Sequence, residues 1–403
     1  MSASTTPVIL AAKRTPIGKF FGGLTKVPSP QLGAYAIQAI ASENAAIGGA
    51  IKGGGVDEVI MGCVLQAGLG QNPARQAALK AGLPDTTSCV TINKVCGSGL
   101  QAVMQAAQSI KAGDNQLVLA GGFESMTRAP YFAAIRDGAG APKFGPMQFE
   151  DHMQYDGLRC AFECWAMGNG ADYIAKKYEI SRADQDRWAE RSHRLAAKAT
   201  KEGWFKNEMM ALTGEQCLDK KSPGVAADEG IRAETTLDSL AKLRNVFEKD
   251  GTVTAGNASQ ISDGGAALCV ASLAKAEALG VKPIAKIVAY HTSGVAPKDI
   301  FRAPALAVPA LLAKAGLSVK DVDLFELNEA FCAQTLQNMK EGCIPEEKVN
   351  IAGGATALGH PIGCSGARVL TTLIHQLHRT GGKRGVAALC LGGGNAVAML
   401  VEV

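Results

Sequence analysis

The feature that most constrains the fold is an internal duplication, because segments far apart in the chain repeat the same patterns in the same order. Each pair combines a strand-like apolar run with a glycine-rich turn, an acidic turn or an amphipathic helix. Three pairs correspond: 56–62 with 322–328, 89–113 with 349–377, and 116–125 with 385–396. Such a repeat predicts two similar βα halves that stack on each other.

The duplication divides the chain into an N-terminal half, 1–280, and a C-terminal half, 281–403. At 403 residues the chain exceeds the usual length of one domain, which agrees with this division. Residues 125–247 are more polar and aromatic, and they predict an inserted loop domain. Within it, Ser181 is a candidate helix N-cap, and Gly203 marks the end of that helix.

Charge and cysteine usage restrict the classes of function. The 41 basic and 37 acidic residues are dispersed, so the net charge of +4 does not indicate a nucleic-acid-binding protein. No run of apolar residues predicts a membrane span or a secretory leader, and the C-terminus carries no peroxisomal signal. Eleven cysteines without disulfide spacing predict reduced thiols and a cytoplasmic protein.

Cys96 is the first candidate for chemistry. It follows a strand-like segment and precedes a predicted helix, where backbone amides and the helix dipole favour a thiolate. Flanking glycines allow a substrate carbonyl to approach closely. On this context alone, a small buried apolar cysteine is the more common interpretation.

His360 lies in the turn of the second half that corresponds to the turn of Cys96. The pseudo-symmetry predicts that the two residues meet, and a neutral imidazole there can accept the thiol proton. Cys390 ends an apolar strand before three glycines and is a candidate second acid or base, or else a structural cysteine. Asn328 also ends a strand, although an Asn before a helix is more often an N-cap.

Five sequence blocks together resemble the thiolase family over essentially the whole chain. The order and spacing of the blocks agree with that family, which makes the combination specific. The blocks are NKVCGSG, GNASQISDGGAA, NEAF, GGATALGHPIGCSG and CLGGGNA.

The resemblance implies a ping-pong acyl transfer between CoA thioesters. It identifies Cys96 as the acyl-carrying nucleophile, His360 as its base and Cys390 as the second acid/base. Asn328 would hold a water in one oxyanion hole with His360, while the N–H groups of Cys96 and Gly392 form the other. The expected reaction is reversible condensation of two acetyl-CoA to acetoacetyl-CoA.

The resemblance also implies a thiolase fold. Two βαβαβαββ halves would form a five-layered αβαβα sandwich, with the inserted loop domain binding CoA. CoA and acyl-CoA are substrates in this family, and neither a cofactor nor a metal is expected. The residues that would contact CoA or the acyl group are Leu158, Met167, Arg232, Ser239, Phe247, Ala255, Ser259 and Phe331.

Three positions depart from the pattern of short-chain members. Ala166 stands where a histidine is common, Gln260 replaces a glycine, and Cys332 replaces an alanine. These departures leave the catalytic set intact but keep the acyl-chain length open. A longer-chain 3-ketoacyl-CoA thiolase of fatty acid β-oxidation is the nearer alternative.

Two further alternatives are a ketoacyl synthase, which Cys390 argues against, and a non-catalytic thiolase-like carrier or lipid-binding protein. The family resemblance suggests a homotetramer built as a dimer of dimers, with residues 144–164 as a candidate contact between dimers.

Overall fold

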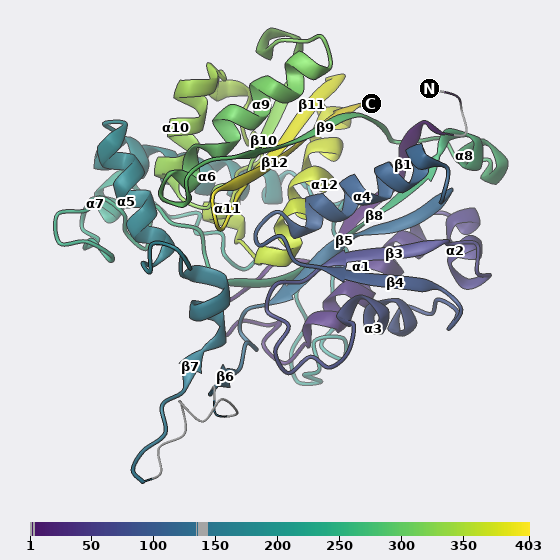
Figure 1. The fold of residues 1–403 in the computed structure, drawn as a ribbon, viewed down its shortest axis with the longest axis horizontal. Helices are drawn as coiled ribbons and strands as arrows, with labels where there is room; N and C mark the ends of the chain where they lie inside the picture. The colour runs from purple at the N-terminus through teal and green to yellow at the C-terminus, as the bar shows by residue number, and fades with distance from the viewer. Residues whose placement is uncertain (1, 3–4, 134, 136–143) are drawn as a thin grey trace.

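The computed structural model describes residues 2, 5–133, 135 and 144–403, which form two halves with the same strand order (Figure 1). The sheet of the first half runs β4-β3-β5-β8-β1, and that of the second runs β10-β11-β12-β9. The strands are β1 (Pro7–Arg14), β3 (Glu58–Gly62), β4 (Ser88–Ile92), β5 (Leu117–Ser125), β8 (Ser262–Ser272), β9 (Ala285–Gly294), β10 (Leu324–Leu327), β11 (Arg384–Leu391) and β12 (Asn395–Glu402).

Strand directions confirm the predicted duplication. In the first half β3 is parallel to both β4 and β5, whereas β5–β8 and β8–β1 are antiparallel. In the second half β10–β11 is parallel, and β11–β12 and β12–β9 are antiparallel. An isolated parallel bridge between Phe325 and Val349 stands where the first half has β4. Each half is therefore a βαβαβαββ unit, with the outermost strand of the second reduced to that bridge.

Helices alternate with the two half-sheets in five layers, as expected for a thiolase fold. Helices α4 and α12 pack against each other and contact strands of both halves, so they form the central layer. Helices α1 and α3 cover the outer face of the first half, and α9 and α10 cover that of the second (Figure 1). Their bounds are α1 (Ser29–Glu43), α3 (Pro73–Lys80), α4 (Ser98–Ala112), α9 (Ala303–Lys314), α10 (Cys332–Gly342) and α12 (Ile362–Thr380). Shorter helices are α2 (Ala45–Lys52), α8 (Leu273–Leu279) and α11 (Ala355–Leu358).

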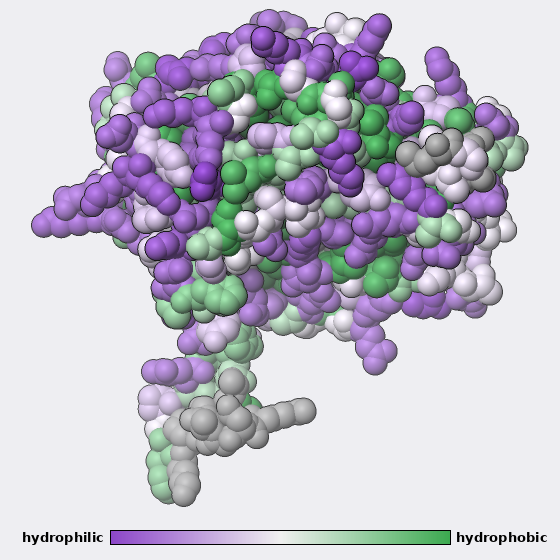
Figure 2. Space-filling view, turned by 45° about the horizontal axis from the view of Figure 1, so that its top comes forward, coloured by the Kyte–Doolittle hydropathy of each residue, from purple (hydrophilic) through white to green (hydrophobic). Residues whose placement is uncertain are grey.

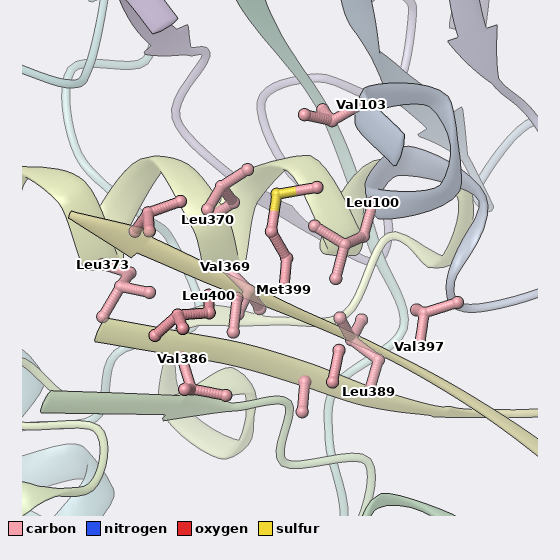
Figure 3. Close-up of a cluster of buried hydrophobic side chains, with 14 of the residues drawn as sticks. Leu100, Val103, Val369, Leu370, Leu373, Val386, Leu389, Val397, Met399 and Leu400 are labelled. Atoms are coloured by element: carbon pink, nitrogen blue, oxygen red, sulfur yellow. The ribbon is translucent and has the colours of Figure 1, made fainter. Parts of the chain in front are cut away.

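The hydrophobic core beside the central helices fixes the position of α12. Leu370 and Leu373 of α12 lie over Val386 of β11 and Leu400 of β12, and Leu100 of the neighbouring helix α4 lies beside them (Figure 3). All five side chains are fully buried. Since burial of a leucine contributes roughly 2 kcal/mol, this core holds the turns at the start of α4 and α12 in place.

The two half-sheets are joined edge to edge. Val8 and Ile9 of β1 pair with Lys286 and Ala285 of β9, so hydrogen bonding is continuous across both halves. A short strand β2 (Gly18–Lys19) pairs with β8 and completes a ten-stranded sheet.

The insertion leaves the sheet at the end of β5 and returns at the start of β8, so it extends beyond the predicted boundary at residue 247. It contains α5 (Met167–Lys177), α6 (Arg182–Lys201) and α7 (Leu237–Ala241). Ser181 is the N-cap of α6, as predicted, since its hydroxyl accepts the N–H of Asp184.

A buried ion cluster fastens the insertion to the first half. Arg14 Nε lies 2.6 Å from Glu208 Oε1, and Arg14 Nη1 lies 2.7 Å from Asp228 Oδ1. Arg14 and Glu208 are fully buried, and Asp228 is nearly so. Because a single charge would be costly there, the three groups must assemble together.

A projecting arm leaves the insertion at the two-stranded ribbon of β6 (Tyr131–Phe132) and β7 (Glu150–Asp151) (Figures 1 and 2). Apolar side chains are exposed on it, among them Tyr131, Phe144 and Phe149. Large exposed apolar surfaces of this kind are typical of protein–protein contacts.

All eleven cysteines lie within the described residues, and all are free. In the described ranges, the helices are too short or too polar to traverse a lipid bilayer.

Candidate active site

Cys96 lies in a constrained turn between β4 and α4. Val95 has a φ of 47°, an unusual value for a β-branched residue, and its N–H donates to Asn93 Oδ1 at 2.9 Å. Gly97 follows, and a side chain at that position would overlap Leu391 at the end of β11. The turn of the first half is thereby pressed against the strand that carries Cys390.

His360 occupies the equivalent turn before α12, as the duplication predicts. Its backbone N–H donates to the Gln260 carbonyl at 3.1 Å. Its ring Nδ1 lies 2.6 Å from Ser365 Oγ, and the Ser365 hydroxyl donates to the Pro361 carbonyl at 2.9 Å. Because that hydroxyl proton is committed to Pro361, Nδ1 carries the proton and donates it to Ser365, which leaves Nε2 as the basic nitrogen.

The side chain of Asn328 contacts the ring of His360. Its Nδ2 lies 3.4 Å from His360 Nε2, and the residue is fully buried at the end of β10. Helix α10 has Phe331 at its N-cap position, so Asn328 is not the N-cap that its sequence context most often indicates. Asn328 Oδ1 is buried and accepts no hydrogen bond from any described residue.

One cavity of about 200 Å³ brings together Cys96, His360, Cys390 and Gly392. Each comes from a turn at the end of a strand: Cys96 after β4, His360 before α12, and Cys390 and Gly392 at the end of β11. The rest of the wall is mainly apolar and includes Ile300 and Phe301. Two thiols and an imidazole therefore share a small, mainly apolar cavity.

The thiol of Cys96 does not behave as its sequence context predicts. Burial raises the pKa of Cys96 to about 12, although the N–H groups of Cys96 and Gly392 lower it. The sequence context favours a thiolate at this helix N-terminus, whereas desolvation of the sulfur favours the neutral thiol and outweighs those amides. The same contact places the two N–H groups where a charge that develops beside the sulfur would be stabilised.

The other two groups are also neutral at rest. Burial, with a smaller effect of Arg368, lowers the pKa of His360 to about 3. Burial and the neighbouring Cys96 raise the pKa of Cys390 well above its ordinary value. The resting site thus holds two thiols and an imidazole without an ion pair.

The predicted substrate-contact residues divide into two groups. Five line the cavity, namely Leu158, Met167, Phe247, Ser259 and Phe331. Three are exposed and do not line it, namely Arg232, Ser239 and Ala255. Ser239 takes part in a capping box with Thr236 at the start of α7. The N–H of Arg232 donates to His193 Nδ1 at 3.1 Å, which fixes the backbone of that loop while its side chain remains exposed.

The three departures from the short-chain pattern have different surroundings. Ala166 and Gln260 line the cavity. Cys332 is fully buried, with its sulfur 3.5 Å from Thr356 Oγ1, and belongs to the core.

Sequence reasoning missed two residues that support the site. Ser365 orients the imidazole of His360, and the only sequence signal was its place in the block GGATALGHPIGCSG. Glu124 is fully buried in β5 and accepts the N–H groups of Val64 at 2.9 Å, Leu65 at 3.1 Å and Gly363 at 3.0 Å. Burial raises the pKa of Glu124 to about 7 against these donors. A charged residue inside an apolar strand sequence was the available signal.

This arrangement suits acyl transfer through a thioester. A thiol nucleophile has a base within the same cavity, backbone donors at its sulfur and a second thiol opposite. Among the described residues, no cluster of three or more histidine, cysteine or acidic side chains has metal-binding geometry.

Comparisons with known proteins agree with this geometry. Residues 7–274 match the family profile "Thiolase, N-terminal domain", and residues 281–403 match "Thiolase, C-terminal domain". The chain is 49% identical over 397 residues to an acetyl-CoA acetyltransferase of Chromobacterium violaceum, with 98% of each chain covered. It is 46% identical over 396 residues to a probable acetyl-CoA acyltransferase of Staphylococcus epidermidis, again with 98% of each covered. The crystal structure of the Bacillus anthracis acetyl-CoA acetyltransferase superposes with a TM-score of 0.93 at 41% identity and covers 100% of both chains.

Proposed function

The chain belongs to the thiolase family, and from this premise we propose that it is an acetyl-CoA C-acetyltransferase that reversibly condenses two acetyl-CoA into acetoacetyl-CoA and CoA. The observation that carries the proposal is the convergence of Cys96, His360 and Cys390 on one cavity. The relatives named acetyl-CoA acetyltransferase support the choice of substrate.

The first half-reaction transfers the acetyl group to Cys96. His360 Nε2 accepts the Cys96 proton while the sulfur attacks the thioester carbonyl, and the N–H groups of Cys96 and Gly392 stabilise the oxyanion. The C–S bond to CoA then breaks, and the CoA thiolate takes its proton from Cys390. The products are acetyl-Cys96, free CoA, an imidazolium at His360 and a thiolate at Cys390.

The second half-reaction forms the carbon–carbon bond. The Cys390 thiolate removes a proton from the methyl carbon of a second acetyl-CoA, and the carbanion attacks the acetyl group on Cys96. His360, now carrying a proton on Nε2, and a water held by Asn328 stabilise the enolate oxygen. Cys96 leaves as a thiolate and recovers its proton from His360, so that every group returns to its resting state.

The coupled proton transfers of Cys96, His360 and Cys390 allow groups that are neutral at rest to catalyse the reaction. In the resting protein, transfer of the Cys96 proton to His360 is unfavourable, because the pKa of the thiol is raised and the pKa of the imidazole is lowered. Because Cys390 releases its proton to CoA in the same half-reaction, the imidazolium forms together with a thiolate inside one cavity. Their mutual attraction in a medium of low dielectric offsets the cost of ionisation.

We also propose how CoA is bound. Arg232 is an exposed cation in a loop whose backbone is fixed, which suits a contact with a CoA phosphate. Ser239 lies farther along the insertion and is assigned to the adenosine end, together with Ala255. Ser259, Leu158, Met167, Phe247 and Phe331 line the cavity and are assigned to the pantetheine and the acyl group. No cofactor is required, since CoA and acyl-CoA are the substrates.

Acetyl transfer gives a direct test. After incubation with acetyl-CoA, the peptide that contains Cys96 should gain the mass of one acetyl group. The Cys96→Ala variant should gain none, whereas Cys390→Ala should be acetylated more slowly, because the leaving CoA loses its proton donor, and should form no acetoacetyl-CoA. Absence of the acetyl group from Cys96 in the parent protein would overturn the proposed function.

A substrate profile separates the short-chain assignment from the longer-chain alternative. Thiolysis of acetoacetyl-CoA should be faster than thiolysis of 3-ketohexanoyl-CoA or 3-ketooctanoyl-CoA. Equal or faster turnover of the longer substrates would replace the assignment by that of a longer-chain 3-ketoacyl-CoA thiolase.

The proposed assembly is a cytoplasmic homotetramer. The projecting arm and the segment that follows it expose Phe144, Phe149, Tyr155 and Phe162, which suits contact with a second copy of the chain. Sedimentation of the parent and of a Phe144→Ser/Phe149→Ser variant tests this assignment, because the variant should sediment as dimers. A parent protein that sediments as a dimer would contradict it.

A further inference from the structure

Gln260 replaces the glycine of the short-chain pattern, and its side chain connects two separate loops. Its Nε2 lies 2.7 Å from the Gly230 carbonyl, 3.1 Å from the Thr356 carbonyl and 3.4 Å from the Ala357 carbonyl. Gly230 belongs to the loop of Arg232, whereas Thr356 and Ala357 belong to α11, which leads into His360. One amide group therefore bridges the insertion and the catalytic turn.

The contacts with α11 supply hydrogen bonds that the helix cannot make itself. Helix α11 has only four residues, and the carbonyls of its last turn have no partners farther along a continuing helix. One N–H of the Gln260 amide donates to Gly230, and the Thr356 and Ala357 carbonyls share the other. A glycine at position 260 would leave both carbonyls without this donor.

The main chain of Gln260 holds the histidine itself. Its carbonyl accepts the N–H of His360 at 3.1 Å and the hydroxyl of Ser262 at 2.8 Å. The same residue thus fixes α11 through its side chain and His360 through its backbone. Because Gln260 also lines the cavity, movement of either loop would change the wall of the cavity where the substrate binds.

The other side of the bridge is equally constrained. A Cβ at Gly230 would lie 2.7 Å from the Ala357 carbonyl and 2.8 Å from Gln260 Oε1, so the two loops touch at this glycine. Two residues later, the N–H of Arg232 donates to His193. The backbone between these contacts has little freedom, and its position follows that of Gln260.

We propose that Gln260 is a positioning residue that couples the Arg232 loop to the turn of His360, so that binding of the distant part of CoA helps to order the catalytic histidine. This inference rests on the proposed function, in which Arg232 contacts CoA. A substrate long enough to contact the Arg232 loop should react faster, because its binding also orders His360. A short thioester that ends before the loop should not.

The test compares Gln260→Met, which keeps the length of the side chain but has no amide, with the parent protein. Thiolysis is measured with acetoacetyl-CoA and with acetoacetyl-N-acetylcysteamine, which lacks the nucleotide and most of the pantetheine. Loss of the hydrogen bonds to Gly230 and α11 should lower kcat/KM for acetoacetyl-CoA by about tenfold more than for the short thioester. The extra loss should lie mainly in kcat, because the binding energy of the distant part of CoA would no longer order His360.

Ser181→Ala serves as the matched control, since it removes one helix-capping hydrogen bond of the insertion away from the cavity. It should leave the ratio of kcat/KM between the two substrates unchanged. If Gln260→Met lowers both substrates equally, or changes neither, the coupling does not exist. Failure of the parent protein to cleave acetoacetyl-CoA would instead refute the proposed function, so the two failures are distinguishable.

Discussion

The orientation of His360 depends on one hydroxyl group, and its removal gives a quantitative prediction. In Ser365→Ala, the buried Nδ1–H of His360 loses its acceptor at 2.6 Å. An unsatisfied buried donor costs about 1–3 kcal/mol. The ring can avoid that cost by moving its proton to Nε2, the nitrogen 3.4 Å from Asn328 Nδ2. The imidazole then has no basic nitrogen toward Cys96.

If about 2 kcal/mol favours the wrong tautomer, the correct one is populated at about 3%, and acetylation of Cys96 should slow roughly 30-fold. Rapid quenching followed by mass analysis of the Cys96 peptide measures this rate, and Ser365→Thr, which keeps the hydroxyl, should retain most of it. Thermal unfolding of both variants controls for a general loss of structure. An alanine variant that is acetylated as fast as the parent would refute the assignment of the Nδ1 proton.

Three further predictions concern buried charge. Glu124→Gln should lower the free energy of unfolding, measured by urea titration, by about 3 kcal/mol, because the new side-chain NH2 group would face backbone N–H donors. The same substitution at the exposed Glu163 should have little effect. Arg14→Met should lower the free energy of unfolding by about 3–5 kcal/mol, because it leaves two buried carboxylates unpaired. Lys26→Met, at the exposed pair with Asp219, should lower it by less than about 1 kcal/mol. Equal losses in the two variants would contradict the role of the buried cluster. Burial lowers the folded-state pKa of His360 to about 3, so the unfolded chain binds the extra proton between about pH 6.5 and pH 3. The stability of the parent relative to His360→Asn should therefore fall by about 1.4 kcal/mol for each pH unit of acidification in that window, and a constant difference would show that His360 titrates normally.

The sequence predicted the architecture well because the duplication is expressed in local patterns. Apolar runs and glycine-rich turns recur in order, and the strand order of both halves follows from them. The edge pairing of Val8 with Lys286 was not predicted, since it depends on how the halves pack rather than on either segment. The late return of the insertion to β8 was missed for a similar reason. Residues 248–261 contain no regular element with a recognisable period.

At the site, the positions of the reactive residues were easier to predict from the sequence than their protonation states. The pairing of the Cys96 and His360 turns follows from the repeat, and both residues line one cavity. The pKa of Cys96 could not be predicted in this way, because it depends on surroundings contributed by distant segments. Ser365 was overlooked because its hydroxyl acts on a neighbouring ring rather than on the cavity. The roles of Arg232, Ser239 and Ala255 stay predictions, since these residues do not line the cavity.

The duplicated fold also explains why the reactive groups are neutral at rest. A site built where two halves meet is buried on both sides, and that burial raises the pKa of both thiols and lowers that of the imidazole. A permanent thiolate would require a fixed cation beside Cys96, and such a cation would also lower the nucleophilicity of the sulfur toward the thioester in the first half-reaction. With neutral groups, charge arises only when a thioester brings a carbonyl to the N–H groups of Cys96 and Gly392. The same burial that suppresses a free thiolate therefore strengthens the oxyanion contacts that replace it during catalysis.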